Sequence, residues 1–451
     1  MLLYHQVFLP GAVDDRCAAH ALIASDLFET YVTYERPGTR WFAGGAMADV
    51  VMERDGITAA AGGRTCRVEL GDAPLRQLGD ALASLALPEY RAFGYVAFEA
   101  GHLVHGTGRL RPEGPPLAHL VVPEIEVRWN AAGTSVRGRS VALVRRVCDV
   151  LQAQRELPDL AGTGVELCEP AARAGYEAMV AEVLRAIRRD GVRKVIASRR
   201  VDVPFPVDLP RSYLLGLALN TPARSFLLDL GGRRAAGFSP EIVAEVEPDG
   251  SVVTQPLAGT RPLRHLTEED ERLGEELSWD VKECYEHVIS ARLAHAELRT
   301  VCQHGSVAVR ELMTVRRRGT VQHLGSVLGG TLAPDRSPWD ALAALFPAVT
   351  ASGVPKRAAL RAIADVEPAE RELYAGVVCV VDGAGGLDAA LVLRSVFQRG
   401  ERTWLQAGAG IVPGSEPGAE FQETTSKLRS AAGCLVAARG AAVAAAEGGR
   451  A

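Results

Sequence analysis

The sequence predicts a large two-lobed α+β fold in which mainly antiparallel sheets are flanked by helices. The first observation is a set of strand-like runs joined by tight turns: residues 225–259 contain three such runs, separated by Gly231–Gly232 and Pro248–Gly250. Residues 373–410 show the same pattern of strand-like runs joined by turns. Hairpins of this kind join antiparallel strands, whereas parallel strands need long crossovers. Helical patterns lie between the runs, and this combination places the chain in the α+β class.

The clearest helical pattern covers residues 174–194, where apolar residues recur at spacings of three and four. Gly191 follows the last turn and predicts the end of this helix. Further helices are expected near residues 265–300, 337–346, 354–370 and 416–437.

The chain divides by the density of its motifs. Residues 1–165 are less motif-dense and are predicted to form the N-terminal part of the fold, and residues 166–437 are predicted to form the catalytic region. Residues 438–451 are rich in Ala and Gly and are expected to fray. The N-terminal segment has no obvious end of its own, which favours one large fold over separate domains.

Composition excludes several classes of protein. Hydrophobic residues make up 47% of the 451 residues, which is enough for a sizeable core. The net charge of −5 is spread along the chain and does not resemble a nucleic-acid footprint. No run of 18 apolar residues predicts a membrane span, and the first residues lack a secretory signal pattern. The 8 cysteines form no C-x-x-C pair, so we expect buried free thiols and a cytoplasmic protein.

Two pairs of glutamates have the E-x-x-E spacing: Glu283 with Glu286, and Glu420 with Glu423. Residues three apart share one face of a helix, so each pair is expected to project together. Four carboxylates in one pocket would repel one another, and a divalent cation would relieve that repulsion. Oxygen ligands completed by waters and a substrate carboxylate fit Mg²⁺. The alternative is that each pair lies on a solvated helix face, with Lys427 as the ion-pair partner of Glu423.

The glycine-rich stretch "AGAGIVPGS" (407–415) is predicted to follow a strand and open a helix. Such a loop presents backbone N–H groups to an anion. Its spacing matches neither a dinucleotide-binding loop nor a P-loop. Binding of a carboxylate by Gly408 and Gly410 is therefore the preferred interpretation.

An acid and a base are suggested by two further motifs. "GFSPEIV" places Glu241 after a tight Ser-Pro turn, and "KVIASR" places Lys194 at the start of a strand. A protonated Glu at pH 7 needs a raised pKa and a neutral Lys needs a lowered pKa, and burial supplies both. The alternative is that both residues are ordinary surface groups.

Taken together, these segments resemble the chorismate-utilising enzymes, the family of anthranilate, aminodeoxychorismate, isochorismate and salicylate synthases. The resemblance covers roughly residues 170–435 and is weaker before them. The motifs that carry it, in chain order, are "KVIASR", "GFSPE", "PLAGTR", "DVKECYEHVIS", "VQHLGSVLGG", "LFPAVTASGVPK", "YAGVVCVVD", "LVLRSV" and "AGAGIVPGSEPGAEFQETTSK".

The resemblance implies a role for each matching residue. Glu286 and Glu423 would ligate Mg²⁺, Glu283 and Glu420 would support the metal through water, and the ion would hold the ring carboxylate of chorismate. Glu241 would be the general acid that protonates the departing C4 hydroxyl. The remaining residues would contact the substrate: Gly259 and Thr260 beside the ring, and Tyr374, Arg394, Lys427, Gly408, Ala409 and Gly410 at the carboxylate of the enolpyruvyl arm.

The nucleophile distinguishes the members of this family. Members that use water are similar in having Lys at the position of Lys194, where anthranilate-type enzymes tend to have Gln, so Lys194 would activate water for attack at C2. "PLAGTR", "LFPAVTASGVPK" and "FGYVAFEAGHLVHG" (93–106) look like the salicylate synthases of siderophore and antibiotic pathways. In those enzymes isochorismate then loses pyruvate, and His323 and Thr350 would lie near the departing arm. A hydrogen-bonded core histidine is the alternative for His323.

The resemblance therefore implies a Mg²⁺-dependent salicylate synthase that acts on chorismate and binds neither nucleic acid nor membrane. Alternatives are an isochorismate synthase with a slow lyase step and an ammonia-using synthase of the anthranilate or aminodeoxychorismate type. A non-catalytic chorismate-binding homologue would have no need of Glu241 or Lys194. No G-x-C-x-G nucleophile elbow is present, so no glutaminase domain is fused to this chain. Because Lys194 implies water as the nucleophile, no glutamine amidotransferase partner is expected, and we expect a monomer.

Overall fold

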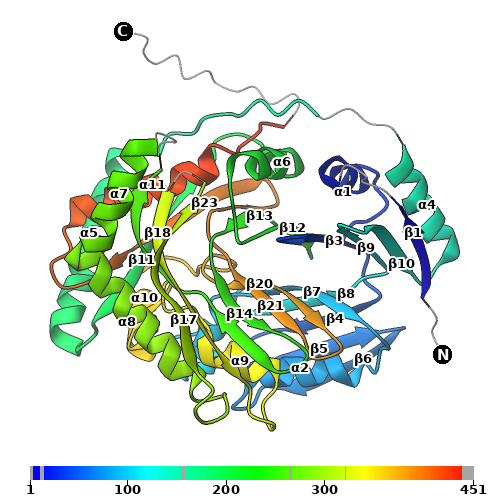
Figure 1. Ribbon diagram of the computed structural model, residues 1–451, viewed down its shortest axis with the longest axis horizontal. Coiled ribbons are helices and arrows are strands. Elements are labelled where there is room, and N and C mark those ends of the chain that lie inside the picture. The colour runs from blue at the N-terminus through cyan, green and yellow to red at the C-terminus, as the bar shows by residue number, and fades with distance from the viewer. Residues whose placement is uncertain are drawn as a thin grey trace.

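The strands of the protein form two large antiparallel sheets covered by helices (Figure 1). The computed structural model describes residues 4–10, 15–153, 158–167, 169–263, 267–319 and 321–438. Every pairing between the described strands is antiparallel. The predicted α+β fold with mainly antiparallel sheets is confirmed.

The first sheet has 11 strands. Their order across the sheet is β1 (His5–Leu9), β10 (Gly133–Gly138), β9 (Ile125–Asn130), β3 (Thr39–Gly44), β2 (Tyr31–Arg36), β12 (Arg224–Leu230), β13 (Arg233–Ser239), β22 (Ser395–Arg399), β23 (Arg402–Ile411), β11 (Lys194–Asp202) and β19 (Gly353–Val354).

The second sheet has 12 strands. Their order is β16 (Leu257–Pro262), β18 (Val321–Thr331), β15 (Ser251–Thr254), β14 (Ile242–Val246), β21 (Leu387–Leu391), β20 (Val377–Asp382), β7 (Arg91–Val96), β8 (Ala118–Val122), β4 (Ala48–Met52), β5 (Gly56–Ala61) and β6 (Arg64–Glu69), with β17 (Ala308–Arg318) paired to β18.

The helices lie around these sheets (Figure 1). They are α1 (Asp15–Ile23), α2 (Pro74–Ser84), α3 (Ala100–Val104), α4 (Val141–Gln152), α5 (Pro170–Asp190), α6 (Leu209–Leu219), α7 (Thr267–Trp279), α8 (Val281–Leu298), α9 (Pro338–Leu345), α10 (Lys356–Val366) and α11 (Pro417–Ala432). Helix α5 ends where predicted, because Gly191 adopts the left-handed conformation with φ 66°.

Two sequence expectations need correction. The glycine stretch was expected to form a loop that opens a helix, but Gly408 and Gly410 lie inside strand β23, and α11 begins only at Pro417. The helical region expected over 265–300 is two helices, because Asp280 caps α8 by accepting a hydrogen bond from the Glu283 N–H at 3.1 Å.

The N-terminal segment does not form a sheet of its own. Strand β2 pairs with β12 of the later chain, with Tyr34 opposite Phe226. Strand β7 pairs with β20, with Gly94 opposite Cys379. The boundary at residue 165 stays a prediction, and the tail beyond residue 438 lies outside the described residues.

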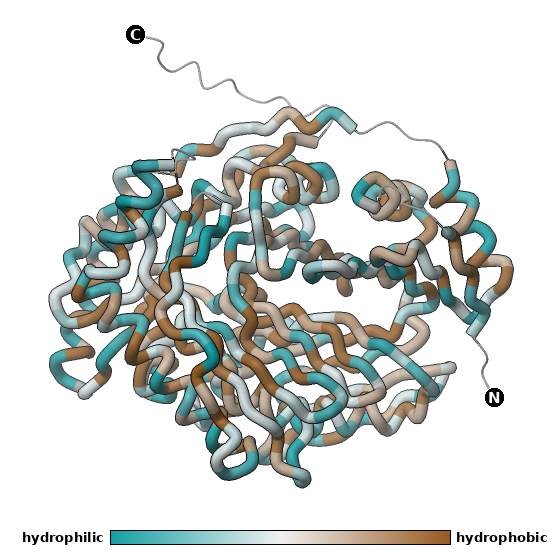
Figure 2. Tube along the Cα trace, viewed as in Figure 1, coloured by the Kyte–Doolittle hydropathy of each residue, from teal (hydrophilic) through white to brown (hydrophobic). Residues whose placement is uncertain are grey.

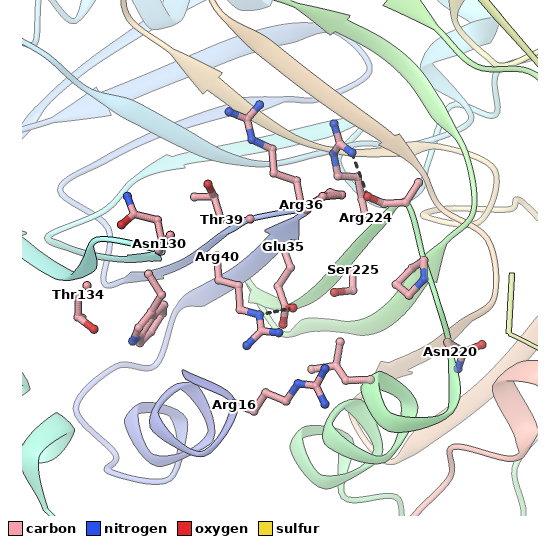
Figure 3. A pocket seen from close by; sticks show the side chains of 18 residues that line it. Arg16, Glu35, Arg36, Thr39, Arg40, Asn130, Thr134, Asn220, Arg224 and Ser225 are labelled. Carbon is pink, nitrogen blue, oxygen red and sulfur yellow. Dashed lines mark hydrogen bonds and ion pairs between the residues drawn. The ribbon is translucent and has the colours of Figure 1, made fainter. Parts of the chain in front are cut away.

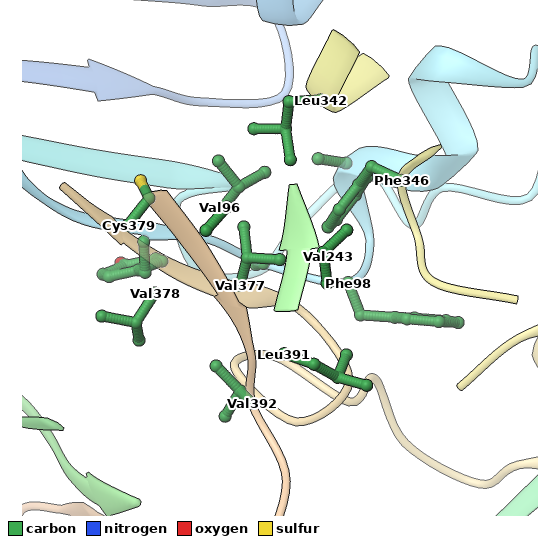
Figure 4. Close-up of a cluster of buried hydrophobic side chains, with 14 of the residues drawn as sticks. Val96, Phe98, Val243, Leu342, Phe346, Val377, Val378, Cys379, Leu391 and Val392 are labelled. Carbon is green, nitrogen blue, oxygen red and sulfur yellow. The ribbon is translucent and has the colours of Figure 1, made fainter. Parts of the chain in front are cut away.

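Apolar side chains fill the space between the sheets and beneath the helices. Figure 4 shows one part of this core, where β14, α9 and the segment between β7 and α3 bring together side chains that include Val243, Leu342 and Phe98. Figure 2 shows hydrophobic segments running along the central strands. A second cluster fills the outer face of the first sheet beneath α1, α4, α6 and α11. The sheets are therefore buried on both faces near the candidate site, which lies where their strands meet.

The described cysteines are free thiols. Cys302, Cys379 and Cys434 are buried as expected, whereas Cys66 is exposed. Cys168 lies outside the described residues. Among the helices described, none is long and apolar enough to cross a lipid bilayer.

Gly94 provides a test of the close packing of β7 against β8. A Cβ atom at Gly94 would lie 1.9 Å from the His119 carbonyl oxygen, so Gly94→Ala must displace backbone in β7 or β8. We expect a loss of about 3 kcal/mol or more in the free energy of unfolding, measured by chemical denaturation. Gly175→Ala is the matched control: it lies in α5 with no atom within 4 Å and should leave stability equal or higher. Equal stability of Gly94→Ala and the parent would contradict this packing.

Candidate active site

One cavity brings together residues from most of the predicted motifs. Twelve of the predicted residues line it: Glu241, Gly259, Thr260, Glu286, His323, Thr350, Tyr374, Arg394, Gly408, Gly410, Glu423 and Lys427. They come from β16, α8, β18, β23 and α11 and from the segments that connect other strands. Residues far apart in the sequence therefore share one surface.

The other four predicted residues do not line the cavity. Lys194 is fully buried and lies directly behind Glu286. Glu283 and Glu420 are buried beside the lining carboxylates, and Ala409 is buried between Gly408 and Gly410 on β23. All four are therefore neighbours of the cavity that do not reach its surface.

Glu241 is a buried acid that remains protonated at neutral pH. It lies in the connection between β13 and β14 and is 3% exposed. The Thr350 hydroxyl donates to Glu241 Oε1 at 2.6 Å, and the Leu257 N–H donates to Oε2 at 3.2 Å. Burial raises the pKa of Glu241 to about 8, and both hydrogen bonds oppose that rise. Burial thus supplies the condition that a general acid requires.

Lys194 forms an ion pair inside the protein. Its Nζ lies 2.9 Å from Glu286 Oε1 and donates to the Ser290 hydroxyl at 3.1 Å. Burial alone would raise the pKa of Glu286, but the Lys194 ammonium holds it below its ordinary value. Lys194 therefore sits one side chain away from the cavity, with Glu286 between them.

Each of the four glutamates faces a cation of the chain. Besides the Lys194–Glu286 pair, Lys427 lies 2.6 Å from Glu423, Lys282 lies 2.9 Å from Glu420, and Arg261 lies 3.6 Å from Glu283. Buried carboxylates need such partners, because an unpaired buried charge is very costly. Glu283 and Glu420 are buried, whereas Glu286 and Glu423 are partly exposed at the cavity, and Lys427 is the ion-pair partner of Glu423 that the alternative expected.

The glutamates also act on one another. Burial and then the neighbouring Glu286 and Glu423 carboxylates raise the pKa of Glu283 to about 7. Burial and Glu423 raise the pKa of Glu420, whose Oε2 is buried without a hydrogen-bond partner. Within the described residues, no three His, Cys, Asp or Glu side chains are already grouped closely enough to hold a metal ion. Mutual repulsion and an orphaned carboxylate oxygen fit a hard divalent cation in the chemistry of their donors.

His323 and Arg394 form a pair at the wall of the cavity. His323 Nδ1 lies 2.9 Å from the Gly259 carbonyl, which can only accept, so Nδ1 carries the proton. Nε2 then accepts from the Arg394 guanidinium. Burial and Arg394 lower the pKa of His323 well below its ordinary value, and burial lowers that of Arg394 to about 9. His323 is therefore neutral, and both of its ring nitrogens are engaged by the protein.

Arg394 is held in an unusual backbone conformation. Its φ is 50°, a left-handed value that costs a non-glycine residue about 1–2 kcal/mol. Nη1 donates to the Arg318 carbonyl at 3.0 Å. Such strain persists only where surrounding contacts enforce it, and here the contacts with Arg318 and His323 fix the guanidinium at the cavity.

The glycines of β23 permit close approach to the cavity. A Cβ atom at Gly410 would lie 2.4 Å from Glu286 Oε1, and one at Gly408 would lie 2.8 Å from the Ala197 carbonyl. Lys427 Nζ donates to the Gly408 carbonyl at 3.0 Å. Burial alone would lower the pKa of Lys427, but the Glu423 carboxylate raises it, so Lys427 stays charged. The glycines therefore leave space for α8 and β11, which differs from the loop that the sequence predicted.

Tyr374 is a neutral phenol at the cavity wall. It is 3% exposed and packs edge-on against Phe397 with ring centroids 6.5 Å apart. Burial raises its pKa to about 12, so the hydroxyl stays protonated and can donate to an anionic ligand.

Sequence reasoning missed part of the lining. The missed residues are Ile196, Pro240, Leu257, Ala258, Ala351, Leu393, Gln406, Ala407 and Ala431. Most are apolar and carry no chemical signal of their own. Several are direct neighbours of predicted residues in the sequence, and this adjacency was the available signal.

A second cavity lies apart from this one and contains none of the predicted site residues (Figure 3). It is bordered by β2, β3, β9 and α6, and Arg40 Nε lies 2.7 Å from Glu35 Oε2 inside it. The two cavities have no lining residue in common.

Comparisons with known proteins agree with the geometry. The family profile of the chorismate binding enzymes matches residues 31–433. A salicylate synthase of Mycolicibacterium paratuberculosis is 39% identical over 433 residues, 95% of each chain. An anthranilate synthase component 1 of Synechocystis is 34% identical over 71% of this chain and 70% of its own.

A solved structure, anthranilate synthase component I from Streptococcus pneumoniae, superposes with a TM-score of 0.76 at 26% identity, covering 88% of this chain and 92% of its own. The family profile covers far more than half of the chain, and the salicylate synthase relative is aligned over nearly all of it. The chain therefore belongs to the family of chorismate binding enzymes.

Proposed function

We propose that the protein is a Mg²⁺-dependent salicylate synthase, which converts chorismate to isochorismate and then to salicylate and pyruvate. The observation that carries this proposal is the pair formed by a buried, protonated Glu241 in the cavity and a buried Lys194 beside it. The relative aligned over 95% of both chains, a salicylate synthase, supports the same activity.

Glu241 supplies the proton for the first step. Hydroxide is a poor leaving group, so the C4 hydroxyl of chorismate departs as water only if an acid protonates it. Glu241 carries that proton at neutral pH because burial raises its pKa to about 8. The Thr350 and Leu257 contacts fix the orientation of its carboxyl group.

Lys194 is the base in this proposal and takes up the proton of the water that attacks C2 from its place behind the cavity wall, with Glu286 between the two. One water enters and one leaves, so chorismate and isochorismate are isomers. A base must be neutral before it takes a proton, and the Glu286 carboxylate lies 2.9 Å from Lys194 Nζ. Glu286 itself lines the cavity, where a second cation could also engage it.

Mg²⁺ is the cation that we propose for this position. Glu286 and Glu423 would hold it, with Glu283 and Glu420 in support, and the orphaned Oε2 of Glu420 is consistent with that set. When bound, the ion neutralises the carboxylates and the ring carboxylate of the substrate.

The second step needs conformation more than acid–base chemistry. The hydrogen on C2 moves to the methylene of the enolpyruvyl arm while the C3–O bond breaks, which gives salicylate and pyruvate. Arg394, Lys427 and Tyr374, with the backbone of Gly408–Gly410, would hold the carboxylate of the arm, and Gly259 and Thr260 would border the ring. The neutral His323 carries a single ring proton, which it donates to the Gly259 carbonyl. We therefore propose that its role is to hold Arg394 in position, through the hydrogen bond that Nε2 accepts from the guanidinium.

Further features of the proposal concern setting and partners. We propose a cytoplasmic monomer that needs no glutamine amidotransferase and supplies salicylate to a siderophore or antibiotic pathway. An isochorismate synthase that releases its intermediate and an ammonia-using synthase are the competing functions. Because anthranilate synthases are among the relatives, the ammonia-using synthase is the competing function to test directly.

The products formed from chorismate test the proposed function. The purified chain is incubated with chorismate and Mg²⁺, with and without ammonium, and the products are identified by mass spectrometry. We expect salicylate and pyruvate in equal amounts under both conditions. Isochorismate without pyruvate would support the first alternative, and a nitrogen-containing product would overturn the proposal.

The pKa of Glu241 predicts the alkaline limit of activity. The acid must be protonated, so kcat/KM for chorismate should be constant below pH 7 with respect to this group and fall as the pH rises through about 8. Thr350→Val removes a hydrogen bond that lowers this pKa and should move the fall to higher pH. If the fall in kcat/KM of Thr350→Val moved to lower pH, Glu241 would not be the acid.

Replacement of Lys194 tests the base. Lys194→Gln should reduce isochorismate and salicylate formation by about 10²-fold or more, because water is no longer deprotonated. Lys356→Gln is the matched control: Lys356 is also buried and pairs with a glutamate, Glu297 at 2.6 Å, but lies outside the cavity. The control should lower the melting temperature and retain water addition. A normal rate in Lys194→Gln would exclude this residue as the base.

A further inference from the structure

A buried cluster of ionisable side chains lies directly behind the cavity and takes no part in the chemistry described so far. It consists of Glu99, Glu367 and Arg371, which are 4%, 6% and 1% exposed. Glu99 belongs to the N-terminal motif at 93–106, and the other two lie at the end of α10 and just beyond it. Ionisable side chains are rarely buried so completely unless contacts satisfy them.

The guanidinium of Arg371 connects two walls of the cavity. Nη1 donates to the Ala351 carbonyl at 2.8 Å, and Nη2 donates to the Ile196 carbonyl at 2.7 Å. Nε donates to Glu367 Oε2 at 2.9 Å, and Nη2 also contacts the other carboxylate oxygen. Ala351 and Ile196 both line the cavity, so a single rigid fork fixes the separation of two lining segments.

The aromatic neighbours of Arg371 include a third lining residue. Its guanidinium carbon lies 4.4 Å from the ring centroid of Phe98 and 5.8 Å from that of Tyr374. Tyr374 lies at the cavity wall. A planar guanidinium packed against aromatic rings has little rotational freedom, which makes this contact part of the same rigid unit.

Glu367 extends the unit to a fourth lining residue. Its Oε1 accepts from the Ser198 N–H at 2.8 Å and from the Ser198 hydroxyl at 2.9 Å. The Gln406 side chain in turn donates to the Ser198 hydroxyl at 2.9 Å. Gln406 lines the cavity from β23.

Glu99 anchors the backbone that carries Arg371. Its carboxyl group accepts from the Arg371 N–H at 2.7 Å and from the Glu372 N–H at 3.0 Å. Glu372 has the left-handed φ of 57°, a strained value that these bonds help to hold. The N-terminal segment thus fixes the position of Arg371 from the far side.

We propose that Arg371 is a positioning residue that holds the segment around Ala351 so that Thr350 stays bonded to Glu241. The proposal rests on the proposed function, in which Glu241 is the acid. Thr350 precedes Ala351 in the chain, and its hydroxyl lies 2.6 Å from Glu241 Oε1. When Arg371 holds the Ala351 carbonyl in place, the neighbouring Thr350 hydroxyl also stays in place, and this hydroxyl orients the Glu241 carboxyl group.

The pH dependence of Glu241 separates positioning from mere stabilisation. Three groups lower the pKa of this carboxyl against the effect of burial: the Thr350 hydroxyl and the Leu257 N–H by hydrogen bonds, and Lys194 by its charge. Arg371 bonds to the carbonyl of Ala351, next to Thr350, and makes none of its side-chain hydrogen bonds to Leu257 or Lys194, so its loss loosens the first of these three effects directly. The pKa of Glu241 should then rise, whereas a purely structural role would lower stability and leave this pKa where it is.

Arg371→Lys is the test variant, because an ammonium keeps the charge opposite Glu367 but cannot reach both carbonyls. The Glu241 carboxyl is titrated by infrared difference spectroscopy, with its band assigned by its loss in Glu241→Gln. We expect its pKa to rise by roughly half to one pH unit, the effect of losing about one hydrogen bond. We also expect kcat/KM for chorismate to fall about tenfold or more. The titration needs no turnover, so it can be read whichever product the enzyme makes.

A double variant and a control complete the test. In a Thr350→Val background, Arg371→Lys should leave the pKa of Glu241 unchanged, because the hydrogen bond from residue 350 to Glu241, through which Arg371 acts, is already absent. Arg224→Lys is the matched control: Arg224 is 5% exposed and pairs with Asp388 at 2.9 Å outside the cavity, so it should lower the melting temperature without moving this pKa.

Two results would overturn the proposal: a folded Arg371→Lys variant with the parent pKa, or an equal rise in the Thr350→Val background. If Arg371→Lys does not fold, Glu99→Gln serves instead. It removes one acceptor of the backbone bonds that anchor Arg371, and it should raise the pKa of Glu241 by a smaller amount. An unchanged pKa in folded Glu99→Gln would then count against the proposal.

Discussion

A charge taken out of water must find a partner inside the protein, and this constraint organises the cavity and what surrounds it. Four glutamates on α8 and α11 are each matched to a cation: Lys194, Lys427, Lys282 and Arg261. The same requirement explains why Arg394 binds His323 and why Arg371 binds Glu367. An apolar wall would place these groups less exactly, because apolar packing has no preferred direction. Ionic and hydrogen-bonded contacts have direction, and they fix each group relative to the others.

The exception is Glu241, which has no cation within bonding distance among its contacts. It remains protonated, and its two hydrogen-bond donors orient it without making it an anion. Two glutamates of one cavity therefore have opposite protonation states: Glu286 is ionised by Lys194, and Glu241 is neutral through burial. Environments that drive two carboxyl pKa values apart are a means of assigning separate chemical roles to the same side chain.

Much of this arrangement could be predicted from the sequence, because motif residues carry their chemistry with them. The E-x-x-E pairs, Lys194 and Glu241 were identifiable, and the order of nine motifs pointed to the family. The prediction for the backbone around the glycines was wrong. A Gly-rich stretch before a helix is typical of an anion-binding loop, but in β23 a side chain at these positions would clash with Glu286 or with β11. Tertiary contacts of this kind have no local signature. For the same reason the apolar lining and the ion pair of Lys194 with Glu286 were not predictable.

The interleaving of early and late strands has a consequence for how the chain folds. Strand β2 near residue 33 pairs with β12 near residue 227, and β7 near residue 93 pairs with β20 near residue 379. When the ribosome has made the first third of the chain, those edges have no partner and present open backbone groups to any other strand. Contacts so distant in sequence also close slowly. Newly made copies therefore depend on protection from aggregation until the last strands emerge, and high expression without chaperone capacity should favour inclusion bodies.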